Sequence, residues 1–431
     1  MPRAFRILMR PVAALLGGTA AFNAGNSLLG VVLPLRMEAA DHPVWLTGLV
    51  MAAFYLGLAL GGLRAKRVIL RIGHIRAFAA FAPVTAASCL FYGFMSAPIA
   101  WVALRIVGGF CIAGMTTAIE SWLNERSANE TRGRVLGVYM LVFYLAVAAG
   151  QSMVNLAPVG GDGHLMIAAA LMGLSLVPVA LTRLGEPSLA EVRVLDVGAL
   201  FAASRVGVGG AAVAGMIVGS FYSLGIVFAR QMGLSVPQAA LFMSTVVMGG
   251  LVFQIPVGLL ADRFDRRVVM ACVLLTVGAS WTAVAVTVGQ NAGPVVVALP
   301  ALLFGGAISG LYPLCVAQTF DRLDRRYYVA ASGRLLMVYS IGAATGPVVA
   351  SAVMSVFGPN YFFALESLVA AAFASVILLR RRMPAPHVGN RARFVPFPDG
   401  APVASGLDPR TDPEHSVDLP RPARRSAGDS G

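Results

Sequence analysis

Charged side chains are scarce in this sequence. Asp, Glu, Lys and Arg make up 12% of the 431 residues, whereas soluble domains carry about 25%. Hydrophobic residues make up 58%, and the mean hydropathy is +0.77; soluble domains are roughly 45–50% apolar. So little charge excludes an ordinary soluble fold, and the sequence predicts an integral membrane protein.

Residues that build chemical sites are also few. The four cysteines, Cys89, Cys111, Cys272 and Cys315, lie in hydrophobic stretches without paired or metal-ligand spacing. We expect them to be packing residues, and we expect no metal. No Gly-rich loop ends in Gly-Lys-Ser or Gly-Lys-Thr, which argues against an ATP-driven pump. A membrane-embedded enzyme would need several titratable residues at one membrane level, which this sequence lacks, so we expect no enzyme and no cofactor.

Long apolar stretches are abundant instead. A helix needs about 20 apolar residues to cross a bilayer, because unpaired backbone groups cannot be left in lipid. The sequence predicts an all-α fold with twelve spans at residues 11–35, 44–63, 76–95, 98–122, 133–157, 164–183, 206–229, 236–260, 268–289, 294–318, 330–356 and 360–379.

The distribution of Lys and Arg predicts the orientation. Arg36 and Arg230 lie in loops on one side and Arg105 lies inside a span, while the others fall on the opposite side or at the termini. By the positive-inside rule, both termini are cytoplasmic. This bias explains the net charge of +13. Nucleic-acid binding is not expected, because no basic face with interleaved aromatic residues lies outside the spans.

The two ends of the chain need separate interpretations. Arg3, Arg6 and Arg10 precede the first apolar stretch as in a signal peptide, but the stretch is too long and eleven more follow, so we expect an uncleaved helix. From residue 383 the chain is rich in proline and arginine with little apolar periodicity. Residues 383–431 are predicted to be a disordered cytoplasmic tail.

Two short strings occur twice. Gly-Arg-Val-Leu-Gly-Val-Tyr at 133–139 matches Gly-Arg-Leu-Leu-Met-Val-Tyr at 333–339, and Gly-Leu-Arg-Ala-Lys-Arg at 62–67 matches Gly-Leu-Leu-Ala-Asp-Arg at 258–263. Both pairs hold equivalent places in two sets of six spans. We predict two six-helix bundles, residues 1–183 and 206–382, joined by a cytoplasmic connector at 184–205. Such repeats suit a carrier whose halves rock about a midplane site.

These features resemble the major facilitator superfamily. The string GLLADRFDRR at 258–267 is similar to the family's G-x-L-A-D-R-x-G-R-R motif, with Asp265 in place of the second glycine, and Arg105 with Gly109 resembles its R-x-x-x-G motif. The strings at 120–124 and 262–267 also look like a little-characterised bacterial branch related to drug-efflux and sugar carriers. The resemblance implies a location in the bacterial inner membrane and a monomer.

The charges in GLLADRFDRR suggest a gate. The resemblance implies that this loop closes the cytoplasmic side, and pseudo-symmetry suggests a partner at the start of span five, near Arg132 and Arg134. A plain positive-inside anchor would explain the arginines but not Asp262 and Asp265. We therefore expect an inner latch that forms only when the cavity opens outward. The predicted gate residues are Asp262, Arg263, Arg266, Arg67, Glu120, Arg134 and Arg334.

A polar cavity is predicted from helical spacing. Arg105 would cost on the order of 2.5–3.5 kcal/mol in lipid, so it should face water or a partner. Gly109, Ile112 and Thr116 share its helical face. Further polar residues follow one face of spans one and five, and the resemblance places spans one, four and five around the cavity. The remaining predicted cavity residues are Thr19, Asn23, Asn26, Gly30, Tyr144, Gln151, Asn155, Ser220, Ser223, Gln254, Tyr312 and Cys315.

These features together indicate a secondary active transporter that moves a small organic molecule, a metabolite or drug-like compound, by alternating access. Proton coupling is expected from the resemblance, with Glu120 and Glu366 the carboxylates within or at the ends of spans. Glu120 suits the gate better, and Glu366 suits helix packing better than a proton relay, because the resemblance places span twelve at the periphery. Gly342 and Gly346 resemble part of an antiporter motif, although close helix packing is the simpler role. A non-transporting sensor or a lipid flippase on the same fold is the alternative.

Overall fold

The computed structural model describes residues 3–95, 97–126, 129–181, 197–290, 292–324, 327–380 and 394, and all regular elements in these ranges are helices. The first half holds α1 (Arg3–Ala39), α2 (Val44–Ile72), α3 (His74–Phe94), α4 (Pro98–Arg126), α5 (Asn129–Ser152), the 3₁₀ turn η1 (Met153–Leu156), α6 (Gly163–Leu174) and α7 (Leu176–Ala180). The second half holds α8 (Val197–Ala203), α9 (Arg205–Gln231), α10 (Val236–Arg263), α11 (Arg266–Gly289), α12 (Pro294–Phe320), α13 (Tyr328–Phe357) and α14 (Asn360–Leu379).

Twelve helical segments among these residues are long and apolar enough to cross a membrane. Each of them overlaps one of the twelve predicted spans, so the predicted all-α membrane fold is confirmed. Span five combines α5 with η1, and span six combines α6 with α7. The short α8 lies within the predicted connector, and residues 184–196 of that connector lie outside the described residues.

Several helices run further than predicted. The prediction ended span two at residue 63 because charges begin there, yet α2 continues to Ile72. Ala65 and Ile69 remain buried in this extension, so an apolar stripe at a spacing of four residues continues along one face. Arg64 and Arg67 on the other faces are exposed. The predicted loop after span two is therefore the end of a helix.

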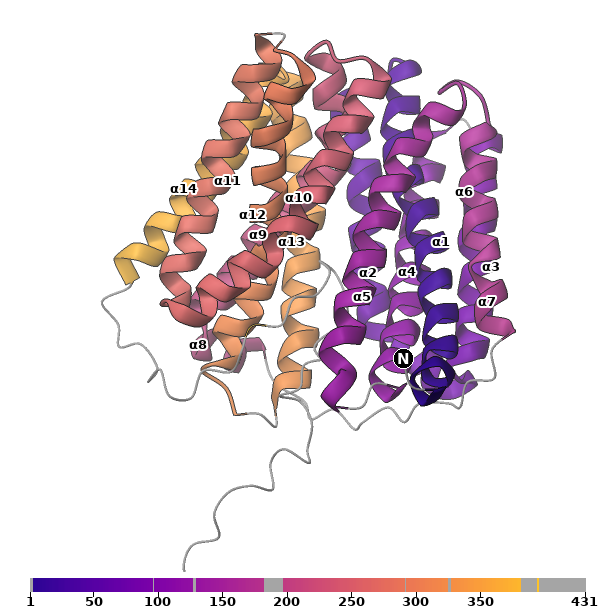
Figure 1. Ribbon diagram of the computed structural model, residues 1–431. Helices are drawn as coiled ribbons and strands as arrows, with labels where there is room; N and C mark the ends of the chain where they lie inside the picture. The colour runs from indigo at the N-terminus through magenta and orange to yellow at the C-terminus, as the bar shows by residue number, and fades with distance from the viewer. Residues whose placement is uncertain are drawn as a thin grey trace, which may run out of the picture.

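The helices form two bundles side by side (Figure 1). In the first half α1 packs on α5, α2 on α4, and α3 on α6; in the second half α9 packs on α13, α10 on α12, and α11 on α14. The same pairs thus recur at equivalent places in the two sets of six spans. The halves meet where α2 contacts α13 and α5 contacts α10.

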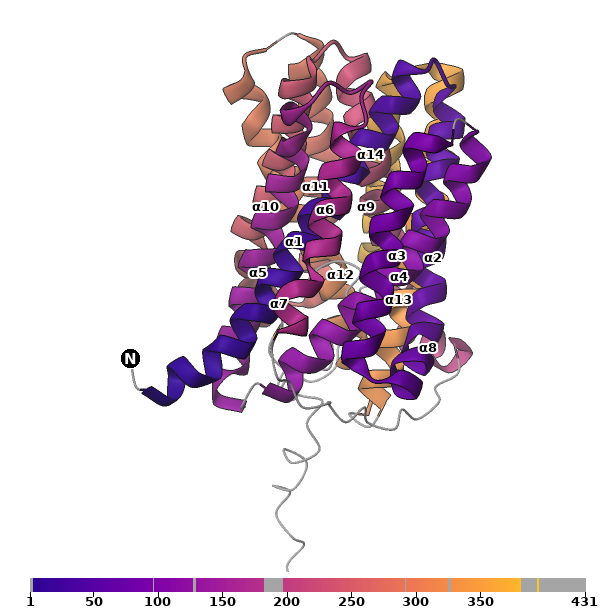
Figure 2. The ribbon, with the colours of Figure 1, turned by 90° about the vertical axis from the view of Figure 1, so that its right-hand side faces the viewer.

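The two ends of the bundle differ in charge. The N-terminus lies at the lower end in Figures 1 and 2. We call the opposite end, where α1 ends, the Arg36 end; the end where α10 meets α11 is the Arg266 end. At the Arg36 end, Arg36 pairs with Asp162 at 2.8 Å and Arg230 pairs with Glu38 at 3.8 Å. Each arginine at this end therefore has an acidic partner.

One residue of the predicted tail is described. The backbone N–H of Phe394 donates to Oδ1 of Asp262 at 2.7 Å. Its ring lies over Gly258, where an added Cβ would collide with it. Phe394 thus packs on the last two turns of α10, at the Arg266 end. The other residues from 383 onward lie outside the described part of the chain.

Candidate functional site

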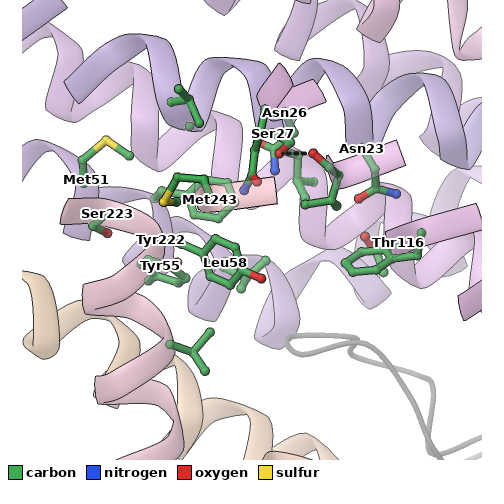
Figure 3. Close-up of a pocket in the computed structure, with 18 of the residues that line it drawn as sticks. Asn23, Asn26, Ser27, Met51, Tyr55, Leu58, Thr116, Tyr222, Ser223 and Met243 are labelled. Carbon is green, nitrogen blue, oxygen red and sulfur yellow. Dashed lines mark hydrogen bonds between the residues drawn. The ribbon is translucent and has the colours of Figure 1, made fainter. Parts of the chain in front are cut away.

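A cavity of about 180 Å³ lies between the two halves. Its walls come from α1, α2, α4 and α5 on one side and from α9, α10 and α13 on the other. Figure 3 shows side chains of both halves around this space, with Asn23 and Thr116 from the first and Tyr222 and Ser223 from the second. A site that draws residues from both halves changes shape whenever the halves move relative to each other.

Arg105 lines this cavity and is 5% exposed. The centre of its guanidinium lies 4.5 Å from the centroid of the Phe54 ring, which is within the range of a cation–π contact. Its Nε has no hydrogen-bond partner, and no described carboxylate forms an ion pair with it. The charge is therefore stabilised only partly by the protein.

Glycines hold α2 and α4 close enough for this contact. An added Cβ at Gly109 would collide with the carbonyl of Phe54, and one at Gly57 would collide with the carbonyl of Ile106. The absence of side chains lets the two backbones touch, and Phe54 then lies beside Arg105. Gly109 was predicted to share the cavity face of Arg105; it packs on α2 instead. Ile112 and Thr116 do line the cavity.

The predicted stripe along span one reaches the cavity in part. Asn23, Asn26 and Gly30 line it. Thr19 does not, because its hydroxyl is buried and donates to the carbonyl of Leu15 at 2.8 Å. A threonine can satisfy itself on its own helix in this way, and spacing alone does not reveal the difference.

The stripe along span five also reaches the cavity in part. Tyr144 and Gln151 line the space. Asn155 lies outside it, exposed in η1, and its amide donates to the carbonyl of Ser152. The prediction assumed one continuous α-helix from 133 to 157. The change to a 3₁₀ turn at Met153 rotates Asn155 away from that face.

Of the candidates in the second half, Ser223 lines the cavity. Ser220, one turn earlier on α9, is buried; its hydroxyl donates to the carbonyl of Met216 and lies beside Glu366 of α14. Cys315 is buried near Gly210 of α9. Neither Ser220 nor Cys315 is among the cavity-lining residues.

Two further candidates lie behind the cavity wall. Gln254 accepts a hydrogen bond from Tyr144 at 3.3 Å and therefore links α10 to α5. Tyr312 packs on Tyr339, with ring centroids 4.7 Å apart, and it is Tyr339 that lines the cavity. Each candidate therefore lies one layer of side chains behind the residues that line the cavity.

Several lining residues were missed. Met51, Tyr55 and Leu58 form one face of α2 toward the cavity, as Figure 3 shows, and Tyr222 precedes Ser223 on α9. Their spacing of three and four residues is visible in the sequence. It does not distinguish a cavity face from a lipid-facing or packed face, because all three are apolar in a membrane protein.

The halves touch closely at the Arg36 end. The hydroxyls of Ser152 on α5 and Ser244 on α10 lie 3.1 Å apart. The backbone N–H of Trp45 donates to Ser355 of α13 at 3.1 Å, and an added Cβ at Gly48 would collide with Ser351. Together with the Arg230–Glu38 pair, these contacts bring the two halves together beside the cavity at this end.

A cluster of charges occupies the Arg266 end. Arg266 is 1% exposed, and it pairs with Asp321 at 2.7 Å and with Asp262 at 3.3 Å. Asp265 caps α11 by accepting from the backbone N–H of Arg267 at 2.9 Å. The aspartate that replaces the second motif glycine thus has a structural role. Asp321, which the sequence prediction did not include, lies closer to Arg266 than Asp262 does.

The predicted gate residues are spread over this end. Arg67, Arg134 and Arg263 are exposed and Arg334 is half-buried. Glu120 is buried and accepts a hydrogen bond from Tyr139 at 3.2 Å. Among the described side chains, Asp262 contacts Arg266 and Phe394 rather than α5. The side chain of Arg132 lies outside the described residues.

Gly342 and Gly346 have the packing role that was favoured for them. Added Cβ atoms there would collide with the carbonyls of Ala212 and Met216 on α9. The two glycines therefore allow close contact between α13 and α9. Glycines likewise allow the close contact between α2 and α4 in the first half.

Twelve spans in two bundles around a shared central cavity define a membrane transport protein. The sequence profile of the Major Facilitator Superfamily matches residues 15–194 and 206–413, nearly the whole chain. The chain therefore belongs to the major facilitator superfamily. Membership of this transporter family supports the expectation that the chain is not an enzyme.

Two relatives are named as uncharacterized transporters of this family. An uncharacterized MFS-type transporter of Enterobacter sp. (strain 638) is 27% identical over 375 residues, which cover 86% of this chain and 96% of the relative. The uncharacterized MFS-type transporter YcaD of Escherichia fergusonii is 27% identical over 393 residues, 90% of this chain and 100% of the relative.

Solved structures share the fold. A bacterial homolog of the human lysosomal transporter Spinster, in an inward-facing and occupied conformation, matches with a TM-score of 0.69 at 16% identity, over 91% of this chain and 99% of that chain. A D-xylose–proton symporter matches with a TM-score of 0.64 at 16% identity, over 88% of this chain and 98% of that chain. At such low identity the likeness concerns the fold alone.

Proposed function

We propose that the protein is a secondary active transporter that moves a small organic molecule across the membrane by alternating access. The observation that carries the proposal is the cavity between the two halves, lined by both and bordered at the Arg36 end by contacts across the interface. On this proposal the described conformation is closed at the Arg36 end. Release of those contacts, with closure at the Arg266 end, gives the alternate state.

The proposed orientation places the Arg266 end in the cytoplasm of a bacterial cell, with both termini on that side and the protein as a monomer in the inner membrane. The excess of Lys and Arg toward that end supports it. Arg36 and Arg230 oppose the bias, but each has an acidic neighbour that offsets its charge. The latch of Asp262, Arg263 and Arg266 with the start of α5 remains part of the proposal for the alternate state.

Proton coupling is the second part of the proposal. Two carboxylates of the membrane-spanning helices are buried, Glu120 and Glu366. Glu120 accepts a hydrogen bond from Tyr139, and Tyr139 lines the cavity. A proton gained or lost at Glu120 would therefore change a contact at the cavity wall. The test is whether an imposed pH gradient drives uptake in vesicles and a protonophore abolishes it.

A disulfide across the Arg36 end tests transport while the substrate is still unidentified. Ser152→Cys with Ser244→Cys places two thiols where the hydroxyls lie 3.1 Å apart, which is close enough for a bridge. Vesicles with the full-length protein are loaded with a metabolite extract, and the solutes that leave are identified by mass spectrometry. We expect release from the reduced double variant, a block on oxidation, and recovery on reduction.

The single variant Ser152→Cys is the matched control and should respond to neither reagent. Oxidised protein that releases the same solutes at the same rate would refute alternating access at this interface. Vesicles that lose no solute faster than protein-free vesicles would refute transport itself.

A further inference from the structure

We propose that the cavity binds a small organic acid with one carboxylate and at least one hydrogen-bond donor. This inference rests on the proposed function, because it takes the cavity to be the transport site. It goes further by naming the chemistry of the substrate. Three kinds of observation carry it: unsatisfied atoms, net charge and size.

Three residues that line this space each carry a buried polar atom without a hydrogen-bond partner. These atoms are Nε of Arg105 on α4, Oε1 of Gln151 on α5 and the hydroxyl of Ser223 on α9. Buried polar groups in proteins are nearly always hydrogen-bonded, and leaving one unpaired costs about 1–3 kcal/mol. These residues lie on three helices and in both halves, so a ligand in this space would lie next to all three.

The polarity of these atoms defines what the ligand offers. The guanidinium of Arg105 only donates, so it needs an acceptor, and a carboxylate matches its two-pronged geometry. The amide oxygen of Gln151 only accepts, so it needs an O–H or N–H group. The hydroxyl of Ser223 can take either part. A hydroxy acid or amino acid carries both kinds of group within a few bonds.

The balance of charge in the cavity limits the chemical class of the ligand. Arg105 is the single charged side chain among the described residues that line the cavity. It has no carboxylate partner among the described residues, and on its other side it contacts the apolar ring of Phe54. A buried charge without a counter-ion is costly, so the site favours a ligand with one negative charge. A phosphate ester would bring close to two charges against this single cation.

The size of the cavity limits the class of ligand further. The cavity measures about 180 Å³. Pockets for drug-sized ligands span about 300–1,000 Å³. The described cavity thus suits a short-chain acid and not a large drug-like compound.

Thermal unfolding of the full-length protein in detergent tests the proposal with matched probes. Lactate and glycerate are the acids, lactamide and glycerol are neutral molecules of similar size, and inorganic phosphate is the competing anion. A ligand that binds the folded state raises the melting temperature with its concentration. We expect at least one acid to do so, and the neutral probes and phosphate to do so at no less than tenfold higher concentration.

Variants then locate the effect. Arg105→Gln should abolish the shift and Arg105→Lys should retain part of it, because lysine keeps the charge but loses the two-pronged geometry. Arg322→Gln is the matched control, since Arg322 is exposed in the loop after α12, and it should leave the shift unchanged. The comparison of lactate with lactamide needs no variant, so it stands even if Arg105→Gln fails to fold.

The proposal is overturned if the neutral probes stabilise the protein as well as the acids do, if no acid stabilises it, or if Arg105→Gln responds like the unsubstituted protein. None of these results would contradict the proposal of transport. Transport is tested separately by the Ser152–Ser244 disulfide, with a metabolite extract that is not selected for acids. Release of neutral solutes in that experiment, with no effect of acids here, would leave a transporter of a different substrate class.

Discussion

At the scale of single residues, Arg266 shows how a membrane protein stabilises a buried charge. The guanidinium is 1% exposed and donates to the carboxylate of Asp321, which is 5% exposed on its side chain, and to the carbonyl of Ala317. Asp262 adds a longer contact at 3.3 Å from a more exposed position. The buried half of this cluster is Arg266 with Asp321, and the accessible half is Asp262.

The Asp321→Ala variant should therefore be strongly destabilised. Removal of one partner of a buried pair leaves the other charge uncompensated, which costs about 3–5 kcal/mol. Asp162→Ala breaks the pair with Arg36, where the carboxylate side chain is 53% exposed, and should cost less than about 1 kcal/mol. Thermal unfolding of both variants in the same detergent measures the contrast. Equal losses would show that burial does not control the strength of the Arg266 pair.

At the scale of elements, α2 and α4 meet through glycine. Gly109 faces the carbonyl of Phe54 with no room for a side chain, whereas an added Cβ at Gly108 would meet no atom within 4 Å. Two adjacent glycines on one helix thus have opposite environments. Substituting each glycine in turn therefore separates the effect of contact between the helices from the effect of glycine on the stability of its own helix.

We expect Gly109→Ala to lower stability by about 1–3 kcal/mol, because the added methyl forces the two backbones apart. The same shift moves Phe54 away from Arg105, so acid binding should weaken as well. Gly108→Ala should be neutral or slightly stabilising, since alanine is the better helix former. Melting temperatures with and without lactate measure both effects. A loss at Gly108→Ala as large as at Gly109→Ala would contradict this account of the contact.

The elements also show what could be predicted from the sequence. Hydropathy predicted all twelve spans, because the bilayer requires apolar length of any helix. Charge marked the span ends too early, since α2 continues through Arg64 and Arg67 while Ala65 and Ile69 keep one face buried. Spacing placed Arg105, Asn23 and Gln151 on the cavity wall.

The remaining site residues depend on tertiary structure. Thr19 bonds within its own helix, and the 3₁₀ turn removes Asn155 from its expected face. Gln254 and Tyr312 lie behind Tyr144 and Tyr339, at a depth that helical spacing cannot specify. Tyr55 was missed because an aromatic residue in a membrane helix has the same pattern whether it faces lipid or a cavity.

At the scale of the whole molecule, the interface between α2 and α13 runs past the cavity. Near the Arg36 end, Gly48 leaves no space for a Cβ against Ser351 and the carbonyl of Pro347. Nearer the Arg266 end, an added Cβ at Gly62 would have Leu336 as its nearest neighbour, at 3.7 Å. The two helices are thus packed more tightly at one end than at the other.

Gly48→Val should therefore shift the population toward a state open at the Arg36 end, because bulk is added where only that state has room. Gly62→Ala is the control and should leave the distribution unchanged. Pulsed electron paramagnetic resonance measures it, with one spin label in the loop between α1 and α2 and another in the loop between α13 and α14. An unchanged distance distribution in Gly48→Val would show that this end does not open between α2 and α13.

The contact between Phe394 and α10 has a consequence for digestion by proteases. A protease that cleaves after aromatic residues needs an extended, accessible backbone, and the N–H of Phe394 is held by Asp262 while its ring covers Gly258. Cleavage at this bond should be slow in the folded protein, although the surrounding sequence has the composition of an easily digested segment. Asp262→Ala removes the acceptor and should speed the cut, with mass spectrometry of the fragments as the readout. Protection from digestion would then be found at a residue beyond the last membrane helix, one that hydropathy alone assigns to the solvent.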